Sequence, residues 1–293
     1  MQLLNNSDIN KLDNLSLKAR YIVEGFILGL HKSPYHGFSV EFSENRKYEP
    51  GDEMKFIDWK VWAKTDSYYV KQFEEETNLL CYILIDQSNS MKYKSNQTSK
   101  LNYVKILASA FSYLILKQQD AVGMISFDEK IKKFITPKSK PSQFKLLTST
   151  LENLIPGNQT SISKVLHQVA DTINKKGLII LFSDLLDNKE DILSSLKHFR
   201  FNGHEVIVFH SLDPNEINFE FSGNIEFRDL ENESVIKTDP RLIAENYKNI
   251  FKQFYDDFKA DCRKNKIDYI QLNTNISYDK YLIDYLLKRK TLR

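Results

Sequence analysis

The sequence predicts an α/β protein: a doubly wound, mostly parallel sheet of six strands with one antiparallel edge strand, preceded by an N-terminal extension of a helix and short strands. Two observations predict this class. From residue 79 onward, short apolar runs alternate with amphipathic segments, an alternation typical of parallel strands joined by crossover helices. Directly after the second apolar run, residues 130–137 alternate apolar and polar positions, which predicts an antiparallel hairpin partner.

The other elements of the domain, residues 79–293, follow the same reasoning. Strands are expected at 79–86, 121–128, 177–184, 204–211 and 266–272, and helices at 101–119, 142–155, 161–174, 189–202, 240–264 and 277–290. Residues 212–239, with Asp213-Pro214 and Gly223, interrupt this pattern and are expected to form an inserted hairpin or loop. Residues 1–78 differ in kind and are expected to form the N-terminal extension, with a helix at about 12–30.

The composition is that of an ordinary globular protein. Of the 293 residues, 41% are hydrophobic and 27% are charged, and the net charge of +2 argues against non-specific nucleic-acid or membrane binding. Only Cys81 and Cys262 occur, which favours an intracellular protein. There is no secretory signal at the N-terminus and no apolar run of the ~20 residues that a bilayer span needs, so a cytoplasmic protein without a transmembrane segment is expected.

The first apolar run of the domain ends in an unusual way, as LLCYILIDQSNSM (79–91). Asp86 closes the strand, and Ser88 and Ser90 follow at every second position. In a sheet of order 3-2-1-4-5-6, the first and fourth strands flank the point where ligands bind beyond the strand ends. Asp184, at the end of the fourth strand, then faces the same crevice as Asp86.

Thr160, at the end of the loop IPGNQTS, adds a third hydroxyl. Two carboxylates and three hydroxyls are hard oxygen donors, which suit Mg²⁺ or Mn²⁺. The alternative is that Ser88 and Ser90 cap a helix or shape a turn, and that Thr160 is an N-cap. A D-x-S-x-S string alone is a weak signal, and it is the position of the donors at two strand ends that favours a metal site.

Zinc is not expected, because the chain has no cluster of cysteine and histidine. The six histidines show no metal-ligand spacing. Four of them are expected at the surface of helices or strands: His167, His198, His204 and His210.

The segments DQSNSM and SDLLD, together with the threonine loop, resemble the metal-ion-dependent adhesion site of von Willebrand factor type A domains. The resemblance implies that Ser88 and Ser90 bind the metal directly, while Asp86, Thr160 and Asp184 complete the shell directly or through water. It also implies an open coordination position for an acidic side chain of a protein partner. One departure is PGNQT, where related sequences usually carry two glycines before the threonine.

Residues 33–76 resemble the segment that precedes the type A domain in a bacterial family, domain of unknown function 58. The motifs are Arg46-x-Tyr48-x-Pro50-Gly51-Asp52 and Ile57-Asp58-Trp59. The resemblance implies a partnership with a MoxR-type AAA+ ATPase in assembling or activating other proteins. Lys55 and Lys64 stand where the family commonly has arginine, and lysine cannot reproduce a bidentate guanidinium contact.

Two functions follow from these features. The first is a non-enzymatic, metal-dependent protein-interaction module, an adaptor or chaperone component that acts with the ATPase. The alternative is a Mg²⁺-dependent phosphatase or phosphotransferase with Asp86 as nucleophile. Haloacid-dehalogenase-type enzymes need a second aspartate two residues later, where this chain has Ser88, and no glycine-rich phosphate loop or Walker-type lysine motif occurs.

Overall fold

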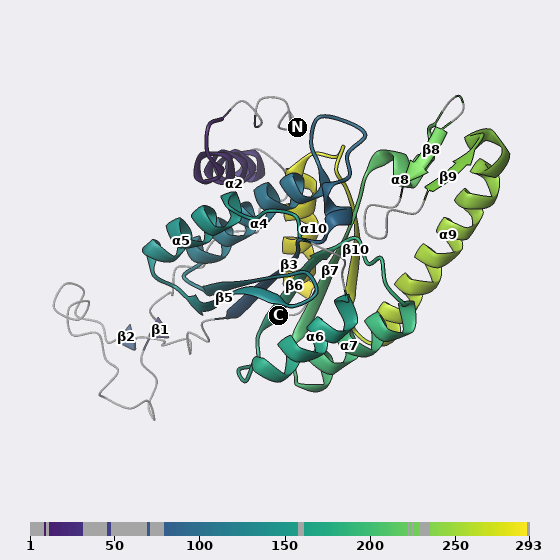
Figure 1. Ribbon diagram of the computed structural model, residues 1–293. Coiled ribbons are helices and arrows are strands. Elements are labelled where there is room, and N and C mark those ends of the chain that lie inside the picture. The colour runs from purple at the N-terminus through teal and green to yellow at the C-terminus, as the bar shows by residue number, and fades with distance from the viewer. Residues whose placement is uncertain are drawn as a thin grey trace. The chain divides into compact units, whose positions relative to one another are not determined.

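A computed structural model describes residues 9, 12–31, 46–47, 69–70, 79–157, 161–221, 223, 225–228 and 235–291 (Figure 1). The chain divides into two compact units, one of Met1–Ile27 with Leu79–Arg293 and one of Leu28–Asn78. In the second unit the structure describes the strands β1 (Arg46–Lys47) and β2 (Tyr69–Val70), which pair antiparallel. The I-D-W motif lies outside the described residues. Of the R-x-Y-x-P-G-D motif, only the backbone of Arg46 and Lys47 in β1 is described.

The expected boundary at residue 78 is one end of the second unit, but the first residues of the chain group with the sheet domain. Helix α2 spans Leu15–His31. Its buried side chains recur every three or four residues, the spacing of one helical face: Leu15, Ala19, Ile22, Val23 and Phe26. The Leu15 amide donates to the Glu152 carboxylate at 3.0 Å, and the Tyr113 hydroxyl donates to Glu24 at 3.0 Å, so α2 is tied to the domain at two points.

The main sheet has six strands, and their order confirms the fold class predicted from the sequence. From one edge to the other they are β10 (Asp268–Asn273), β7 (Glu205–Leu212), β6 (Leu178–Ser183), β3 (Leu80–Asp86), β4 (Ala121–Phe127) and β5 (Ile131–Lys138). All neighbours are parallel except β5, which is antiparallel to β4. In chain order this is 3-2-1-4-5-6, so the direction of winding changes between β3 and β6.

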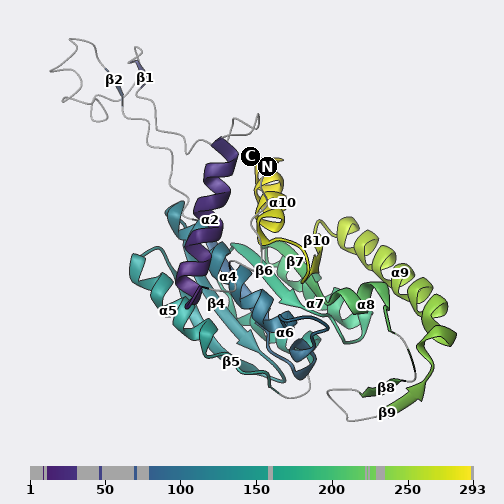
Figure 2. The same ribbon diagram turned by 90° about the horizontal axis from the view of Figure 1, so that it is seen from above.

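Helices cover both faces of this sheet (Figures 1 and 2). One face carries α4 (Lys100–Lys117), α5 (Pro141–Glu152) and α10 (Tyr278–Thr291); the other carries α6 (Ile162–Thr172), α7 (Lys189–Phe201) and the C-terminal part of α9 (Pro240–Lys264). The interruption between β7 and α9 contains the short helix α8 (Pro214–Asn218) and a hairpin of β8 (Ile225–Arg228) and β9 (Val235–Thr238). No helix in these described ranges is long and apolar enough to cross a membrane.

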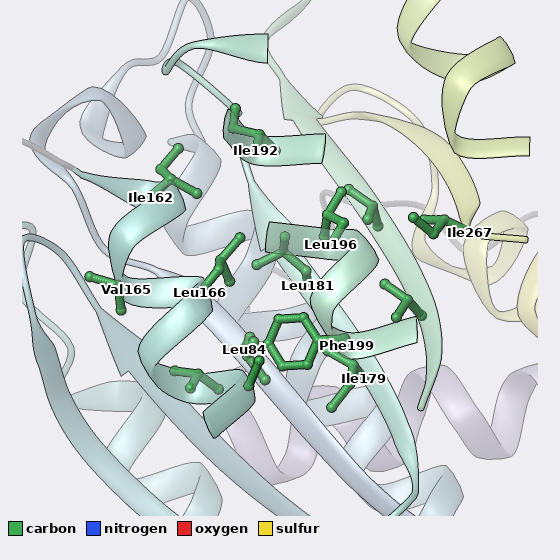
Figure 3. Close-up of a cluster of buried hydrophobic side chains, with 14 of the residues drawn as sticks. Leu84, Ile162, Val165, Leu166, Ile179, Leu181, Ile192, Leu196, Phe199 and Ile267 are labelled. Carbon is green, nitrogen blue, oxygen red and sulfur yellow. The ribbon is translucent and has the colours of Figure 1, made fainter. Parts of the chain in front are cut away.

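Because both faces are covered, β3, β4 and β6 are buried almost along their whole length, which explains their continuous apolar sequences. Under α6 and α7, side chains such as Leu84, Leu166 and Phe199 form one cluster (Figure 3). On the opposite face the core is aromatic. The Phe111 ring of α4 lies 5.4 Å from that of Phe209 and 5.1 Å from that of Tyr285, measured between centroids.

Helix α7 carries one phenylalanine in the core and one at the surface. Phe199 is fully buried, whereas Phe201, two residues later, is 90% exposed. Phe199→Ala should lower the free energy of unfolding by about 3–5 kcal/mol, because it removes a ring and leaves a cavity. Phe201→Ala should change it by about 0.5 kcal/mol or less. Urea unfolding of both variants measures this; similar losses would contradict the assignment of the α7 face.

Candidate metal centre

Asp86 closes β3 with a carboxylate that is fully buried and held by two hydrogen bonds. The Ser88 amide donates to Oδ1 at 2.8 Å, and the Ser183 hydroxyl at the end of β6 donates to Oδ2 at 2.7 Å. The register of the two strands, which places Ile85 opposite Phe182, brings Ser183 beside Asp86. The end of β3 is therefore fastened to the end of β6, as the predicted order requires.

Ser88 and Ser90 lie together and do not cap the following helix. Ser88 precedes the 3₁₀ turn η2 (Asn89–Lys92), but its side chain makes no capping hydrogen bond. Instead its hydroxyl oxygen lies 2.9 Å from that of Ser90, and both residues are buried. The cap of α4 is Ser99, whose side chain accepts from the Asn102 amide at 3.2 Å. The capping interpretation of Ser88 is therefore not what the structure shows.

Thr160 lies outside the described residues, so its place in the site stays a prediction. The start of its loop is nevertheless fixed against the serine loop, because the Gly157 amide donates to the Gln87 carbonyl at 2.6 Å. A Cβ at Gly157 would lie 2.1 Å from an Asp128 carboxylate oxygen, so a larger residue there would displace the Asp128 side chain. The N-cap of α6 is Ser161.

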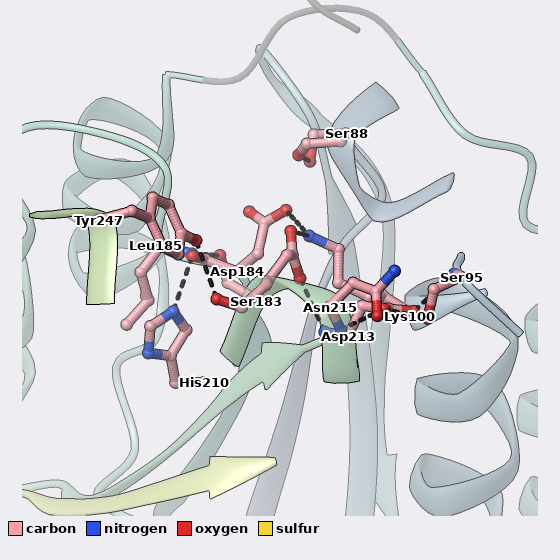
Figure 4. A network of polar contacts seen from close by, with 12 residues as sticks. Ser88, Ser95, Lys100, Ser183, Asp184, Leu185, His210, Asp213, Asn215 and Tyr247 are labelled. Carbon is pink, nitrogen blue, oxygen red and sulfur yellow. Dashed lines mark hydrogen bonds and ion pairs between the residues drawn. The ribbon is translucent and has the colours of Figure 1, made fainter. Parts of the chain in front are cut away.

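Asp184 follows β6 and points one oxygen at a buried lysine (Figure 4). The Lys100 ammonium donates to Asp184 Oδ2 at 2.8 Å and to Glu216 Oε1 at 2.7 Å. The other oxygen of Asp184, Oδ1, is buried and has no hydrogen-bond partner among the described residues. Buried polar atoms are nearly always satisfied, so this oxygen has room to accept a hydrogen bond or to bind a cation.

Negative charge exceeds positive charge in this network. Asp86 and Asp184 are buried, Glu216 is 23% exposed, and Lys100 is the cation that bridges two of them. Burial, and then the neighbouring Asp184 carboxylate, raises the pKa of Asp86 above its ordinary value. Burial also raises the pKa of Glu216, against the opposing effect of Lys100. Burial lowers the pKa of Lys100, but the carboxylates of Asp184 and Glu216 outweigh it and raise that pKa overall.

His210 on β7 was expected at the surface, and this expectation is wrong. Its side chain is 2% exposed, with Nε2 3.0 Å from the Asp184 carbonyl oxygen and Nδ1 hydrogen-bonded to the Tyr269 hydroxyl. Burial lowers the pKa of His210 to about 4, so the ring is neutral near pH 7. His204, expected at the surface as well, is also buried, because it follows α7 at the start of β7.

The backbone after Asp184 is strained. Leu185 has φ of 54°, in the left-handed region that a leucine rarely adopts, and its amide donates to the Ser183 hydroxyl at 3.0 Å. Such conformations persist where surrounding contacts hold them and are concentrated at functional sites. Here the turn directs the Asp184 side chain toward Lys100, while the Asp184 backbone carbonyl lies within hydrogen-bond distance of His210.

These donors fit a hard divalent cation. Among the described residues, no group of three or more histidine, cysteine, aspartate or glutamate side chains could hold a metal ion, so a site here would depend on hydroxyl oxygens. The paired hydroxyls of Ser88 and Ser90, the excess of carboxylates and the unsatisfied Asp184 Oδ1 supply such a set. Of the five predicted ligands, four are described, and all four are at the ends of β3 and β6 or in the loop after β3.

Sequence reasoning did not find the supporting residues Lys100, Ser183, His210 and Glu216. The signal for Ser183 was present, because it precedes Asp184 in SDLLD. Nothing in the sequence marks Lys100 or Glu216, since a lysine at a helix start and a glutamate in an insertion are usually exposed.

Comparison with known proteins decides the family. A family model described as "Protein of unknown function DUF58" matches residues 44–254, most of the chain and nearly all of the candidate site. The chain belongs to the DUF58 family. The α/β fold class, with its mostly parallel sheet of six strands, is the one predicted.

Three similar proteins share little sequence with this DUF58 protein. The uncharacterized protein Rv1480 of Mycobacterium tuberculosis is 22% identical over 236 residues, covering 79% of this chain and 74% of the relative. The conserved hypothetical protein BatB of Bacteroides thetaiotaomicron is similar in structure, with a TM-score of 0.50 and 19% identity, over 73% of this chain and 99% of that one. The VWA domain of SpRpn10 has a TM-score of 0.43 and 12% identity, over 71% of this chain and 94% of that one. The likeness to BatB shows a shared fold.

Lys100 should be the costliest polar residue of the site to replace. Lys100→Met should lower the free energy of unfolding, measured in chelator, by about 3–5 kcal/mol, because Asp184 then stays buried without its cation. The matched control is Lys237→Met, since Lys237 is 77% exposed and pairs with Glu226 at 3.2 Å; its effect should stay below about 1 kcal/mol. Equal effects would show that Lys100 carries no buried ion pair.

His210 predicts a pH dependence of stability. Its folded pKa of about 4 lies below the ordinary 6.5, so between these values the unfolded chain binds a proton that the folded chain does not. The stability of the wild type relative to His210→Gln should therefore fall by up to about 3 kcal/mol as the pH drops from 6.5 to 4. Urea unfolding of both proteins across this range measures it. Above pH 7 the difference should be constant; a constant difference throughout would refute the assignment.

Proposed function

We propose that this DUF58 protein is a Mg²⁺- or Mn²⁺-dependent protein-interaction module. The observation that carries the proposal is the unsatisfied Asp184 Oδ1. It belongs to a buried, negatively charged network at the carboxyl ends of β3 and β6, where the direction of winding changes. Ligands of doubly wound sheets bind at this point. Lys100 alone does not balance the negative charge of the carboxylates, and a divalent ion would do so.

The proposed ligands are those expected from the sequence. Ser88 and Ser90 would bind the ion directly, and Asp86, Thr160 and Asp184 would complete the shell directly or through water. When bound, the ion supplies an electrophilic centre for an acidic side chain of a partner protein. The chain's own residues set that centre: the Ser88 amide and the Ser183 hydroxyl orient Asp86, and Lys100 holds one oxygen of Asp184 so that the other remains available.

We further propose a MoxR-type AAA+ ATPase as the partner, with this protein as an adaptor or chaperone component in the cytoplasm. Membership of the DUF58 family and the resemblance of residues 33–76 support this partner.

Catalysis by Asp86 as a nucleophile is not what we propose. Both of its carboxylate oxygens accept hydrogen bonds, one from a backbone amide and one from Ser183, and the side chain is fully buried. An attacking carboxylate needs access to its substrate, and the burial of Asp86 denies it. These contacts support a role in binding.

Metal binding is tested by stability in Mg²⁺ or Mn²⁺ against chelator. A ligand at 100 times its dissociation constant stabilises the folded state by about 2.7 kcal/mol, and the wild type should show a shift of this order. Ser88→Ala should abolish most of the shift, because it deletes the hydroxyl but keeps the amide that holds Asp86. Ser149→Ala, the same change on the exposed side of α5, should retain it. No shift in the wild type would sink the proposed metal site.

The same variants test the partner. A MoxR-type ATPase should co-purify with the wild type and with Ser149→Ala in Mg²⁺, and should be lost in chelator or with Ser88→Ala. Co-purification that ignores both the chelator and Ser88→Ala would mean that the ATPase binds elsewhere, even if the metal shift is observed.

A further inference from the structure

The outer edge of β10 is open. In the sheet, β10 pairs with β7, and within the described part of the chain no strand pairs with its other side. The Thr274 amide donates toward β7, to the Leu212 carbonyl at 3.1 Å, whereas the Asn273 amide donates away from β7, to the Tyr281 hydroxyl at 2.7 Å. Because backbone amides alternate in direction along a strand, those of Tyr269 and Gln271 point outward with that of Asn273. This edge offers a template for another strand.

The edge opens into a groove between two helices. Figure 2 shows β10 between α9 and α10. Two adjoining hollows of about 440 and 560 Å³ lie along it, and both are lined by Ile217, Tyr255 and Gln271. The strand spans six residues, roughly 20 Å at the usual rise. Tyr281 occupies its last outward position, at Asn273, so an extended peptide would pair along Tyr269 and Gln271.

The walls of the groove are basic. Lys248 and Lys252 line the first hollow and Lys259 and Lys280 line the second, against one carboxylate in each, Glu220 and Asp284. Three of these lysines stand on one stripe of α9, at spacings that place them on the same helical face as Tyr255. All four lysines are exposed, and none takes part in an ion pair among the described residues. The groove therefore carries unbalanced positive charge above an apolar and aromatic floor.

We propose that this groove binds an acidic, extended peptide segment of a partner protein, which adds a strand to the outer edge of β10. The Tyr269 and Gln271 amides pair with the peptide backbone, the lysines of α9 and α10 face its carboxylates, and Tyr255 and Ile217 contact its apolar side chains. An open strand edge recognises the backbone of a peptide, whereas a nucleic acid or a lipid headgroup would use only the charge.

This surface is separate from the candidate metal centre. It is built from α8, β10, α9 and α10, while the predicted ligands are in and after β3 and β6 and in the loop before α6. Lysines recognise the acidic peptide here and no metal ion is needed. Chelator and Ser88→Ala should therefore leave the affinity for the peptide unchanged. The two proposals can thus fail independently.

The test is fluorescence anisotropy of the full chain with a labelled peptide of about eight residues that alternates glutamate with valine or tyrosine. One control peptide carries N-methyl groups at alternate backbone amides, and another replaces glutamate by lysine. A single-stranded thymidine oligonucleotide serves as a polyanion without a peptide backbone. The acidic peptide should bind, and each of the three controls should bind at least about tenfold more weakly.

Variants locate the binding. Lys252→Glu and Lys259→Glu should each weaken the peptide by about tenfold, while Lys164→Glu, the same change on the exposed side of α6, should not. Hydrogen exchange should show protection of the Tyr269 and Gln271 amides when the peptide is bound. Binding of the N-methylated peptide with equal affinity, equal binding of the oligonucleotide, loss of binding in chelator, or no binding at all would each overturn the proposal.

Discussion

The ammonium of Lys100 is the constraint on which the rest of the site depends. It is buried at the start of α4, and it joins Asp184, which follows β6, to Glu216 in the insertion after β7. A buried cation is tolerated only when it is paired and hydrogen-bonded, so these carboxylates cannot move away without leaving it unsatisfied. One side chain thereby fixes the start of α4, the end of β6 and the insertion relative to each other.

The contacts of Glu216 extend this constraint outward. Glu216 closes a capping box with Asp213 at the start of α8, and Asp213 accepts hydrogen bonds from both the amide and the hydroxyl of Ser95. The Tyr247 hydroxyl of α9 donates to the Glu216 carbonyl at 2.8 Å. The loop after β3, the helix α8 and the helix α9 are thus linked through neighbours of one ion pair. Any change in charge at Asp184 would be felt first by Lys100 and then by this chain of contacts.

The class and strand order of the sheet domain could be predicted from the sequence, and the residues that support the candidate site could not. Strands such as β3 and β6 are continuous apolar runs because both faces of the sheet are covered, and the alternation of β5 marks it as the exposed antiparallel edge. The positions of Asp86 and Asp184 at the strand ends could be predicted because each closes such a run. Residues that act through tertiary contact gave no local signal: Lys100 stands in an ordinary helix start, and His210 in a strand whose burial depends on α9 and β10.

In the N-terminal region, too, the sequence indicates a helix but not the surface that the helix packs against. The amphipathic stripe of α2 was readable as a helix, but which surface it covers depends on Glu152 and Tyr113, far along the chain. Residue pattern gives the existence of an element, whereas its partner is a property of the whole fold.

The orientation of Asp184 explains how one network can serve both stability and binding. A carboxylate has two oxygens, and Lys100 satisfies one of them through a buried charge-assisted hydrogen bond. If both oxygens were satisfied by protein groups, the residue would be structural only. If neither were, no side-chain contact would fix the direction of the carboxylate. The arrangement observed, with one oxygen anchored and one unsatisfied, keeps the side chain in place without a ligand and leaves a free-energy gain for a cation that completes it.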